Sequence, residues 1–89
     1  MVRCRVIVSS RADKFLSELD GTLRHRIVEE ISDLEDFPFS MKPHDIAKLK
    51  GRKNYYRMRV GKIRIIFRVD RNRRIVYVVK IGYREAVYE

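Results

Sequence analysis

Apolar residues in the first half of the chain recur every three or four positions, which is the spacing of one buried face of a helix. After a short β-branched strand at residues 3–8, Ser10 begins a first predicted helix, which stops before Gly21. A second apolar stripe predicts a helix over residues 22–36, which ends near Pro38 because the residue before a proline disfavours the α region. The two stripes consist of Ala12, Phe15, Leu16, Leu19, Leu23, Ile27, Ile31 and Leu34.

The second half of the chain alternates with the two-residue period of β-strands. Residues 55–60 and 62–69 predict two strands joined at Gly61, which stands at the first central position of a type II′ hairpin turn. A third strand over residues 74–81 is apolar on both faces, as in a strand partly covered on each side. Residues 40–53 contain proline and glycine and are interpreted as a connecting loop. The inward positions are Tyr56, Met58, Val60, Ile63, Ile65, Phe67 and Val69.

These elements predict an α+β fold with the order β-α-α-β-β-β. Two N-terminal helices would pack on one face of a small, mainly antiparallel sheet. Residues 1–89 are expected to form one domain, since compact domains usually run to about 100–150 residues. A chain of this length with 45% hydrophobic residues excludes a multidomain enzyme and argues against a deep cofactor pocket. Any active site is therefore expected on the surface.

The net charge of +9 is distributed unevenly along the chain. Residues 1–45 carry seven Lys/Arg and nine Asp/Glu, whereas residues 46–89 carry fourteen Lys/Arg and three Asp/Glu. The two halves therefore have net charges of −2 and +11. So basic a segment implies a polyanionic partner, with nucleic acid first.

The strand period places several of these cations on one face of the sheet, opposite the helices. A twisted sheet that exposes arginines beside aromatic rings can hold RNA phosphates bidentately and stack unpaired bases. The alternative is that such arginines only keep the face soluble and protect the sheet edges. The cations expected on this face are Arg57, Arg59, Arg64, Arg68 and Lys80, and the aromatic residues beside them are Tyr55, Tyr83 and Tyr88.

Other kinds of site find little support in the sequence. The single cysteine, Cys4, excludes intramolecular disulfides and multi-cysteine zinc sites, and a buried structural thiol in a reducing compartment is expected. His25 and His44 lack the spacing and companions of metal ligands and are expected on the surface, so no metal is expected. The apolar run at residues 6–8 is too short for a signal or membrane-spanning segment.

RNA cleavage needs no metal or histidine when the RNA 2′-hydroxyl is the nucleophile. This transesterification needs in-line positioning, neutralisation of the developing charge, a base near the 2′-oxygen and an acid near the 5′-oxygen. Arginines supply the charge but are poor bases, because a guanidinium is almost always protonated. Tyr83 or Tyr88 could exchange the proton if nearby arginines favour the phenolate.

Four short motifs occur in a characteristic order. They are Lys48-Leu49-Lys50-Gly51, Tyr56-Arg57-Met58-Arg59-Val60-Gly61, Ile63-Arg64 and Ile81-Gly82-Tyr83-Arg84-Glu85-Ala86-Val87-Tyr88. In order and spacing they resemble the RelE/ParE toxin superfamily, on its RelE side, over nearly the whole chain. Many relatives end in a Gly-His-Arg-x-x-Val-Tyr pattern, in which Tyr83 here replaces the histidine.

The resemblance implies a toxin of a type II toxin–antitoxin pair that enters the ribosomal A site and cuts mRNA there without a cofactor. Arg64 matches the arginine that holds the scissile phosphate, and Arg84 matches the proposed general acid. Tyr88 matches the C-terminal tyrosine that stacks on the substrate base. Arg57 and Arg59 match basic positions that are often lysine, so cleavage is expected to be slow or to shift the role of the base to Tyr88.

The resemblance also implies a set of partners and of functional residues. The partners are mRNA, the ribosome and a RelB-like antitoxin whose acidic groups would neutralise the arginines, all in the cytoplasm. The expected catalytic residues are Arg59, Arg64, Arg84 and Tyr88, and the expected RNA-binding residues are Lys50, Arg57, Arg68, Lys80 and Tyr83. Two alternatives remain: a ParE-like toxin that inhibits DNA gyrase, and a non-catalytic RNA-binding or ribosome-binding module. The combined arginine and tyrosine set disfavours the gyrase inhibitor, which needs no RNA-cleaving groups.

Overall fold

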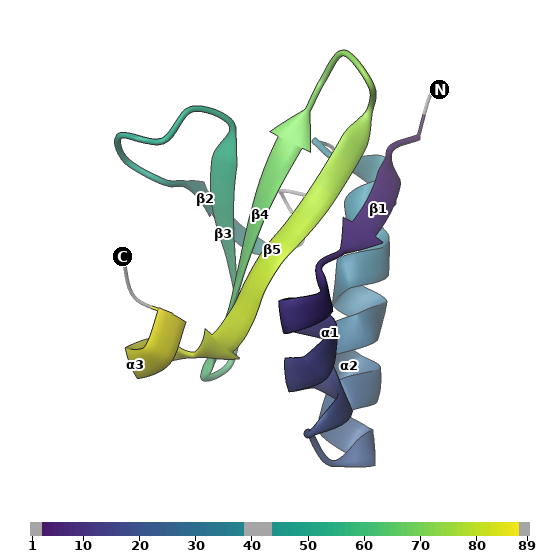
Figure 1. Cartoon of the computed structure of the whole chain (residues 1–89), viewed down its shortest axis with the longest axis vertical. Coiled ribbons are helices and arrows are strands. Elements are labelled where there is room, and N and C mark those ends of the chain that lie inside the picture. The colour runs from purple at the N-terminus through teal and green to yellow at the C-terminus, as the bar shows by residue number, and fades with distance from the viewer. Residues whose placement is uncertain (1–2, 39–43, 88–89) are drawn as a thin grey trace.

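The computed structural model describes residues 3–38 and 44–87, which form two helices against a five-stranded sheet (Figure 1). The elements are β1 (Arg5–Val8), α1 (Ser10–Ser17), α2 (Gly21–Ser32), the 3₁₀ helix η1 (Asp33–Asp36), β2 (Asp45–Lys48), β3 (Tyr55–Val60), β4 (Ile63–Asp70), β5 (Ile75–Tyr83) and α3 (Arg84–Val87). The strand order is β1-β5-β4-β3-β2. β1 runs parallel to β5, and the other neighbours are antiparallel. The predicted α+β class is confirmed.

The segment interpreted as a connecting loop contains a strand, so the predicted four-stranded order was wrong. Residues 45–48 form β2 at one edge of the sheet, where Asp45 pairs with Arg59 and Lys48 with Tyr56. The four residues of β2 have charged ends and no long alternation, so the strand depends on its pairing with β3. The predicted second helix is α-helical only to Ser32, and residues 33–36 continue it as the 3₁₀ helix η1.

Side-chain caps fix where both long helices begin. The Ser9 hydroxyl accepts a hydrogen bond from the Ala12 N–H at 3.1 Å, so the cap of α1 lies one residue before the predicted start. The Asp20 carboxylate accepts from the Leu23 N–H at 3.0 Å and caps α2 in the same way. The predicted break between the two helices is therefore the capping site of the second.

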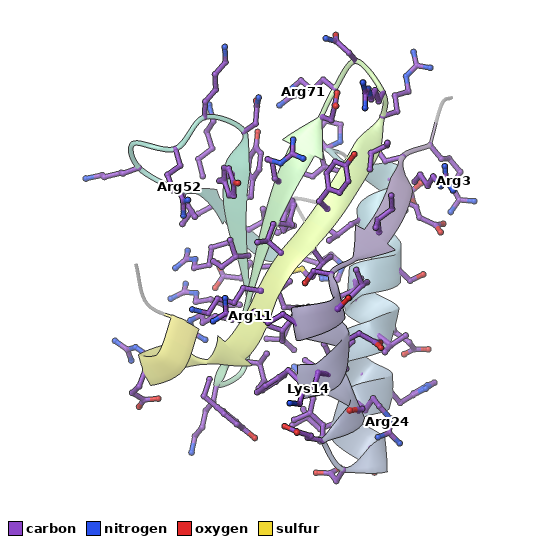
Figure 2. The ribbon with its side chains drawn as sticks, viewed as in Figure 1. Arg3, Arg11, Lys14, Arg24, Arg52 and Arg71 are labelled. Atoms are coloured by element: carbon purple, nitrogen blue, oxygen red, sulfur yellow. The ribbon has the colours of Figure 1, made fainter. Side chains whose placement is uncertain are left out.

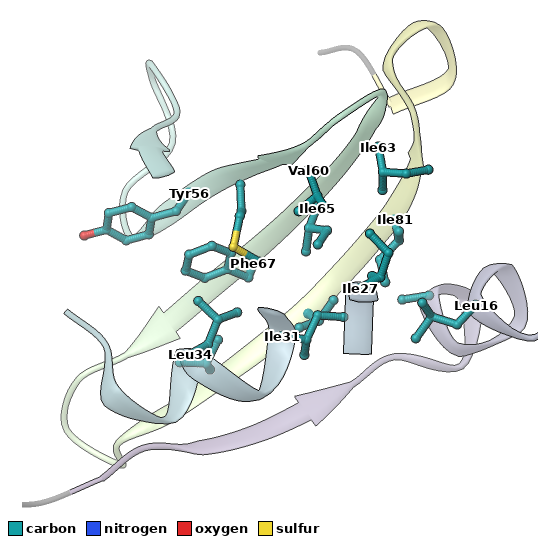
Figure 3. Close-up of a cluster of buried hydrophobic side chains, with 14 of the residues drawn as sticks. Leu16, Ile27, Ile31, Leu34, Tyr56, Val60, Ile63, Ile65, Phe67 and Ile81 are labelled. Carbon is teal, nitrogen blue, oxygen red and sulfur yellow. The ribbon is translucent and has the colours of Figure 1, made fainter. Parts of the chain in front are cut away.

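The hydrophobic core lies between the helices and one face of the sheet (Figure 3). Phe67 is fully buried, stacks on Tyr56 with ring centroids 5.5 Å apart and meets Phe37 edge-on at 5.7 Å. All seven strand positions predicted to face inward are buried, as are the stripe residues Ala12, Leu16, Leu19, Ile27, Ile31 and Leu34. The hydrophobic pattern therefore identified the core correctly.

A bulge in β5 changes which of its residues face the core. Ile66 pairs with Lys80 but the next residue, Phe67, pairs with Val78, so Val79 has no partner on β4. Val78 consequently faces the core before the bulge and Ile81 faces it after. The irregularity breaks the two-residue period and turns the intervening residues of β5 outward.

Gly61 supplies the backbone conformation of the turn between β3 and β4. Its φ is 60°, which residues with a Cβ rarely adopt. Among the described non-glycine residues, positive φ values occur at Asn54 and Arg74, so Lys62 has a negative φ and the turn fits the predicted type II′ geometry.

We expect Gly61→Ala to lower the free energy of unfolding by about 1–2 kcal/mol, because alanine must then hold a left-handed φ. The added Cβ would meet no atom within 4 Å, so a clash cannot account for the loss. Gly21→Ala, at the start of α2, is the matched control and is expected to raise stability by about 0.4–1 kcal/mol. Urea denaturation measures both variants, and a shift of the same sign in the two would contradict the strain argument.

Candidate nucleic-acid interface

Cationic side chains gather on the sheet face that points away from α1 and α2. The strand register places Arg59 of β3 opposite Arg64 of β4, and Arg57 opposite Ile66, which pairs in turn with Lys80 of β5. These positions alternate with buried core residues on the same strands. The predicted basic residues therefore share one surface, called here the arginine face and defined by Arg57, Arg59, Arg64, Arg68 and Lys80.

The positive charge is most concentrated around Arg64. Partial burial lowers the pKa of the Arg64 guanidinium from its ordinary value. The charges of three neighbours lower the same pKa further, in the order Arg59, Arg84 and Arg57, whereas the Asp45 carboxylate raises it. Arginine remains protonated near neutral pH, so four guanidinium groups present a dense positive charge to a ligand on this face.

One turn of the chain positions two of these arginines. Nη1 of Arg64 donates hydrogen bonds to the carbonyl oxygens of Gly61 at 2.9 Å and Ile63 at 3.1 Å, both at the β3–β4 hairpin. The backbone N–H of Arg84, the first residue of α3, donates to the carbonyl oxygen of Lys62 at 3.1 Å. The hairpin therefore brings Arg84, far away in sequence, to the end of the sheet that carries Arg64.

Asp45 on β2 is a member of this site that sequence reasoning missed. Its Oδ2 accepts a hydrogen bond from Nε of Arg59 at 2.6 Å and forms an ion pair with Nη2 of the same guanidinium, also at 2.6 Å. The two residues are direct neighbours in the β2–β3 pairing. A signal was available, because Asp45 is the single acidic residue between positions 37 and 69. Its place became visible only once β2 was known to be a strand.

Aromatic rings flank the other end of the arginine face. Arg68 pairs with Tyr55 on one side and with Tyr77 on the other, and its guanidinium lies 4.4 Å from the centre of the Tyr77 ring. Arg52, labelled in Figure 2, lies in the turn before β3. Its guanidinium carbon is 4.6 Å from the centre of the Tyr55 ring. Sequence reasoning missed Tyr77, since unbroken alternation back from the inward-facing Ile81 would have put it in the core.

Two of the predicted site residues, Tyr83 and Lys50, do not lie on the arginine face. Tyr83 pairs with the core residue Ile63 and packs edge-on against Phe15 of α1 with ring centroids 5.5 Å apart, so the expectation that it stands beside the arginines was wrong. Lys50 is exposed in the turn between β2 and β3. Tyr88 lies outside the described residues. Among the described residues, the aromatic neighbours of Arg68 on the arginine face are therefore Tyr55 and Tyr77.

The two histidines differ in their surroundings. His25 is exposed, as predicted. The prediction of a surface His44 without carboxylate companions was wrong, because its side chain is only 13% exposed and lies between two acids. Its Nδ1 lies 3.2 Å from a carboxylate oxygen of Glu30, and its Nε2 lies 2.9 Å from one of Asp33. These contacts tie the residue before β2 to α2 and η1.

The remaining candidate groups give no further site. Cys4 is half-buried, and desolvation raises the pKa of its thiol, although the charges of Arg74 and Arg71 oppose the shift. In residues 3–38 and 44–87, no group of three or more His, Cys, Asp and Glu side chains is arranged to hold a metal ion. No helix in the same part of the chain has the length and apolar character needed to span a membrane.

Residues 6–88 match the family described as the ParE toxin of the type II toxin–antitoxin system parDE. The chain belongs to the RelE/ParE toxin superfamily. This toxin is 32% identical to a Methanocaldococcus jannaschii protein named "Putative toxin RelE1" over 88 residues, which cover 99% of this chain and 98% of that protein. The matched family and the relatives show that it is a RelE-family toxin of a type II toxin–antitoxin system.

Solved structures of the superfamily share the fold of this toxin. The RelE of the archaeal RelE–RelB complex from Pyrococcus horikoshii OT3 is 28% identical, with a TM-score of 0.79 over 91% of this chain and 94% of that one. The RelB–RelE complex from Methanococcus jannaschii gives 28% identity and a TM-score of 0.75 over 92% and 94% of the two chains. These matches show that the chain has the α+β fold of known RelE structures, as predicted.

Proposed function

We propose that this toxin is a ribosome-dependent endoribonuclease that cuts mRNA in the ribosomal A site. The observation that carries the proposal is the electrostatically coupled cluster of Arg57, Arg59, Arg64 and Arg84 at one end of an open sheet face. Such a cluster stabilises the negative charge that develops on a phosphate during transesterification. Because the RNA 2′-hydroxyl is the nucleophile, the protein needs neither a metal nor a nucleophilic side chain.

The proposed roles follow from where the side chains lie. Arg64, held by the hairpin, binds the scissile phosphate, and Arg57 and Arg59 add charge beside it. Arg84 reaches the same phosphate from α3 and stands nearest to the role of acid for the 5′-oxygen. At the other end of the face, Tyr55 and Tyr77 with Arg68 offer rings and a guanidinium plane on which unpaired bases can stack. The roles of Lys50, Lys80, Tyr83 and Tyr88 in binding or cleavage stay predictions.

Dependence on the ribosome agrees with the shape of the face. Helices α1 and α2 cover the opposite side of the sheet and leave the arginine face uncovered (Figure 1). Something other than the toxin must hold the message in line for attack, since geometry accounts for much of the rate in such reactions. The net charge of +9 favours docking against ribosomal RNA.

An acidic, RelB-like antitoxin is the proposed protein partner, and the cytoplasm is the proposed location. The solved relatives from Pyrococcus and Methanococcus are RelE–RelB complexes. A partner that brings carboxylates to the arginine face would block RNA binding, and complementary charge would speed its association at low salt. The ribosomes that the proposed activity requires place the toxin in the cytoplasm.

The decisive experiment adds purified toxin to ribosomes programmed with a defined A-site codon and maps the message by primer extension. We expect a cut within that codon and little cleavage of the same RNA without ribosomes. Arg26→Ala is the matched charge control, because Arg26 lies on the exposed side of α2 and pairs with Glu30 at 3.4 Å. This variant should cut as the wild type does.

An intact message at an excess of toxin over ribosomes would refute the endonuclease proposal. Gyrase inhibition is the second candidate, favoured by the ParE name of the matched family. A supercoiling assay run in parallel distinguishes it, since a ParE-like toxin would block supercoiling and leave the message uncut. Binding to programmed ribosomes with neither effect would indicate a non-catalytic module.

A further inference from the structure

Among the arginines and tyrosines that the structure describes, the arginine face lacks an obvious group to accept the proton of the 2′-hydroxyl. Arginines cannot do so near neutral pH, because they remain protonated. Tyr83 stands on the other face of the sheet, against Phe15. The residue at position 59 is an arginine, which serves poorly as a base but well as the bidentate partner of a carboxylate. That partner is present on the neighbouring strand.

Asp45 lies where a proton acceptor is needed. The register places Asp45, Arg59 and Arg64 in one row across three adjacent strands, on the same face of the sheet. Adjacent strands are about 4.8 Å apart, so the row spans about 10 Å between backbones, which the long arginine side chains can bridge.

The ion pair orients the Asp45 carboxylate and leaves one of its oxygens available. Oδ2 makes both contacts with the Arg59 guanidinium, and within the described part of the chain Oδ1 has no hydrogen-bond partner. The Asp45 side chain is 47% exposed, so an RNA ribose on the arginine face can reach Oδ1. A carboxylate held by one oxygen and open at the other is suited to taking a proton from a bound substrate.

We propose that Asp45 is the general base of the cleavage reaction and that Arg59 positions it; the inference rests on the proposed endoribonuclease function. Oδ1 of Asp45 takes the proton of the 2′-hydroxyl as the 2′-oxygen forms its bond to phosphorus. The P–O5′ bond breaks, its electron pair leaves with the 5′-oxygen, and that oxygen takes a proton from Arg84, which recovers one from the solvent. The products are a 2′,3′-cyclic phosphate and a 5′-hydroxyl, and Asp45 returns its proton to the solvent.

The first test compares single-turnover cleavage of ribosome-bound mRNA by the wild type, Asp45→Asn and Asp13→Asn. Asparagine keeps an oxygen for Arg59 but cannot accept the proton, so the rate should fall by about 100-fold or more. Asp13 is an exposed carboxylate in the first turn of α1, and its replacement makes the same charge change away from the face. We expect Asp13→Asn to cut as the wild type does.

Several outcomes separate this inference from the proposed function. A wild type that does not cut refutes the function itself. A wild type that cuts, with an Asp45→Asn variant within about threefold of its rate, refutes only the role of Asp45. Circular dichroism and ribosome binding are measured on each variant, and a folded, bound but inactive Asp45→Asn protein supports the proposal.

A second test uses Asp45→Ala and added carboxylates at constant ionic strength. If Asp45 is a base, acetate should restore more cleavage than formate, because the more basic carboxylate removes the proton more readily. Chloride should restore none. Equal recovery with formate, acetate and chloride would show that an anion beside Arg59 suffices, and would overturn the base assignment even if Asp45→Asn is inactive or misfolded.

Discussion

Arg64→Ala is expected to lower the rate of ribosome-dependent mRNA cleavage by about 100- to 1,000-fold, the usual effect of removing one group that stabilises transition-state charge. Arg64 lies at the centre of the arginine cluster, where Arg59, Arg84 and Arg57 all act on it. Its removal deletes the cation that the hairpin holds in place for the scissile phosphate. Primer extension under single-turnover conditions measures the loss.

The fold of the Arg64→Ala variant should remain intact. The side chain makes its hydrogen bonds to the carbonyl oxygens of Gly61 and Ile63 at the β3–β4 hairpin, so we expect a cost in stability of about 1 kcal/mol. Arg64→Lys tests whether charge alone suffices, because lysine keeps the positive charge but lacks the planar, bidentate guanidinium group. Wild-type cleavage by an Arg64→Ala protein with a normal circular dichroism spectrum would remove Arg64 from the mechanism.

The largest effect on stability is expected from Phe67→Ala, at about 3–5 kcal/mol of the free energy of unfolding. Phe67 is fully buried and lies against the rings of Tyr56 and Phe37, so truncation leaves a cavity lined by two aromatic side chains. The total free energy of unfolding of a small domain is about 5–15 kcal/mol, so the variant should be close to unfolding. Urea denaturation followed by circular dichroism gives the value.

Val28→Ala is the matched control for the core substitution. Val28 is 45% exposed on α2, so truncating it should change stability by less than about 0.5 kcal/mol. If Phe67→Ala cost no more than Val28→Ala, the position of the core between helices and sheet would be in doubt. The arginine face does not include Phe67. Cleavage by the Phe67→Ala protein is therefore compared with cleavage by the wild type at a temperature at which the variant is folded.

Much of the site could be predicted from the sequence because the strands obey a simple period. The alternation in β3 and β4 assigned Arg57, Arg59 and Arg64 to one surface, and the register confirms that they share it. The prediction of outward-facing residues was wrong where the two-residue period is broken. The bulge at Val79 turned Tyr77 outward, and no residue pattern in β5 announces that irregularity.

The turn and edge residues show a second limit. Asp45 could not be predicted as a site residue, because β2 is four residues long and forms through its pairing with β3 and not through the β-propensity of its residues. His44 was misplaced for a similar reason, since its carboxylate neighbours Glu30 and Asp33 come from α2 and η1, more than ten residues earlier. Contacts between distant segments leave no periodic trace in the chain.

The sequence alone determined the α+β class, the core and the uneven distribution of charge, because burial and strand geometry impose local periods that a chain must display. The tertiary structure alone decided which arginines act on one another and which carboxylate faces them. The hairpin brings Arg84 to Arg64, and the edge strand brings Asp45 to Arg59. Charges interact through space over a few ångströms, and only the folded sheet sets those distances.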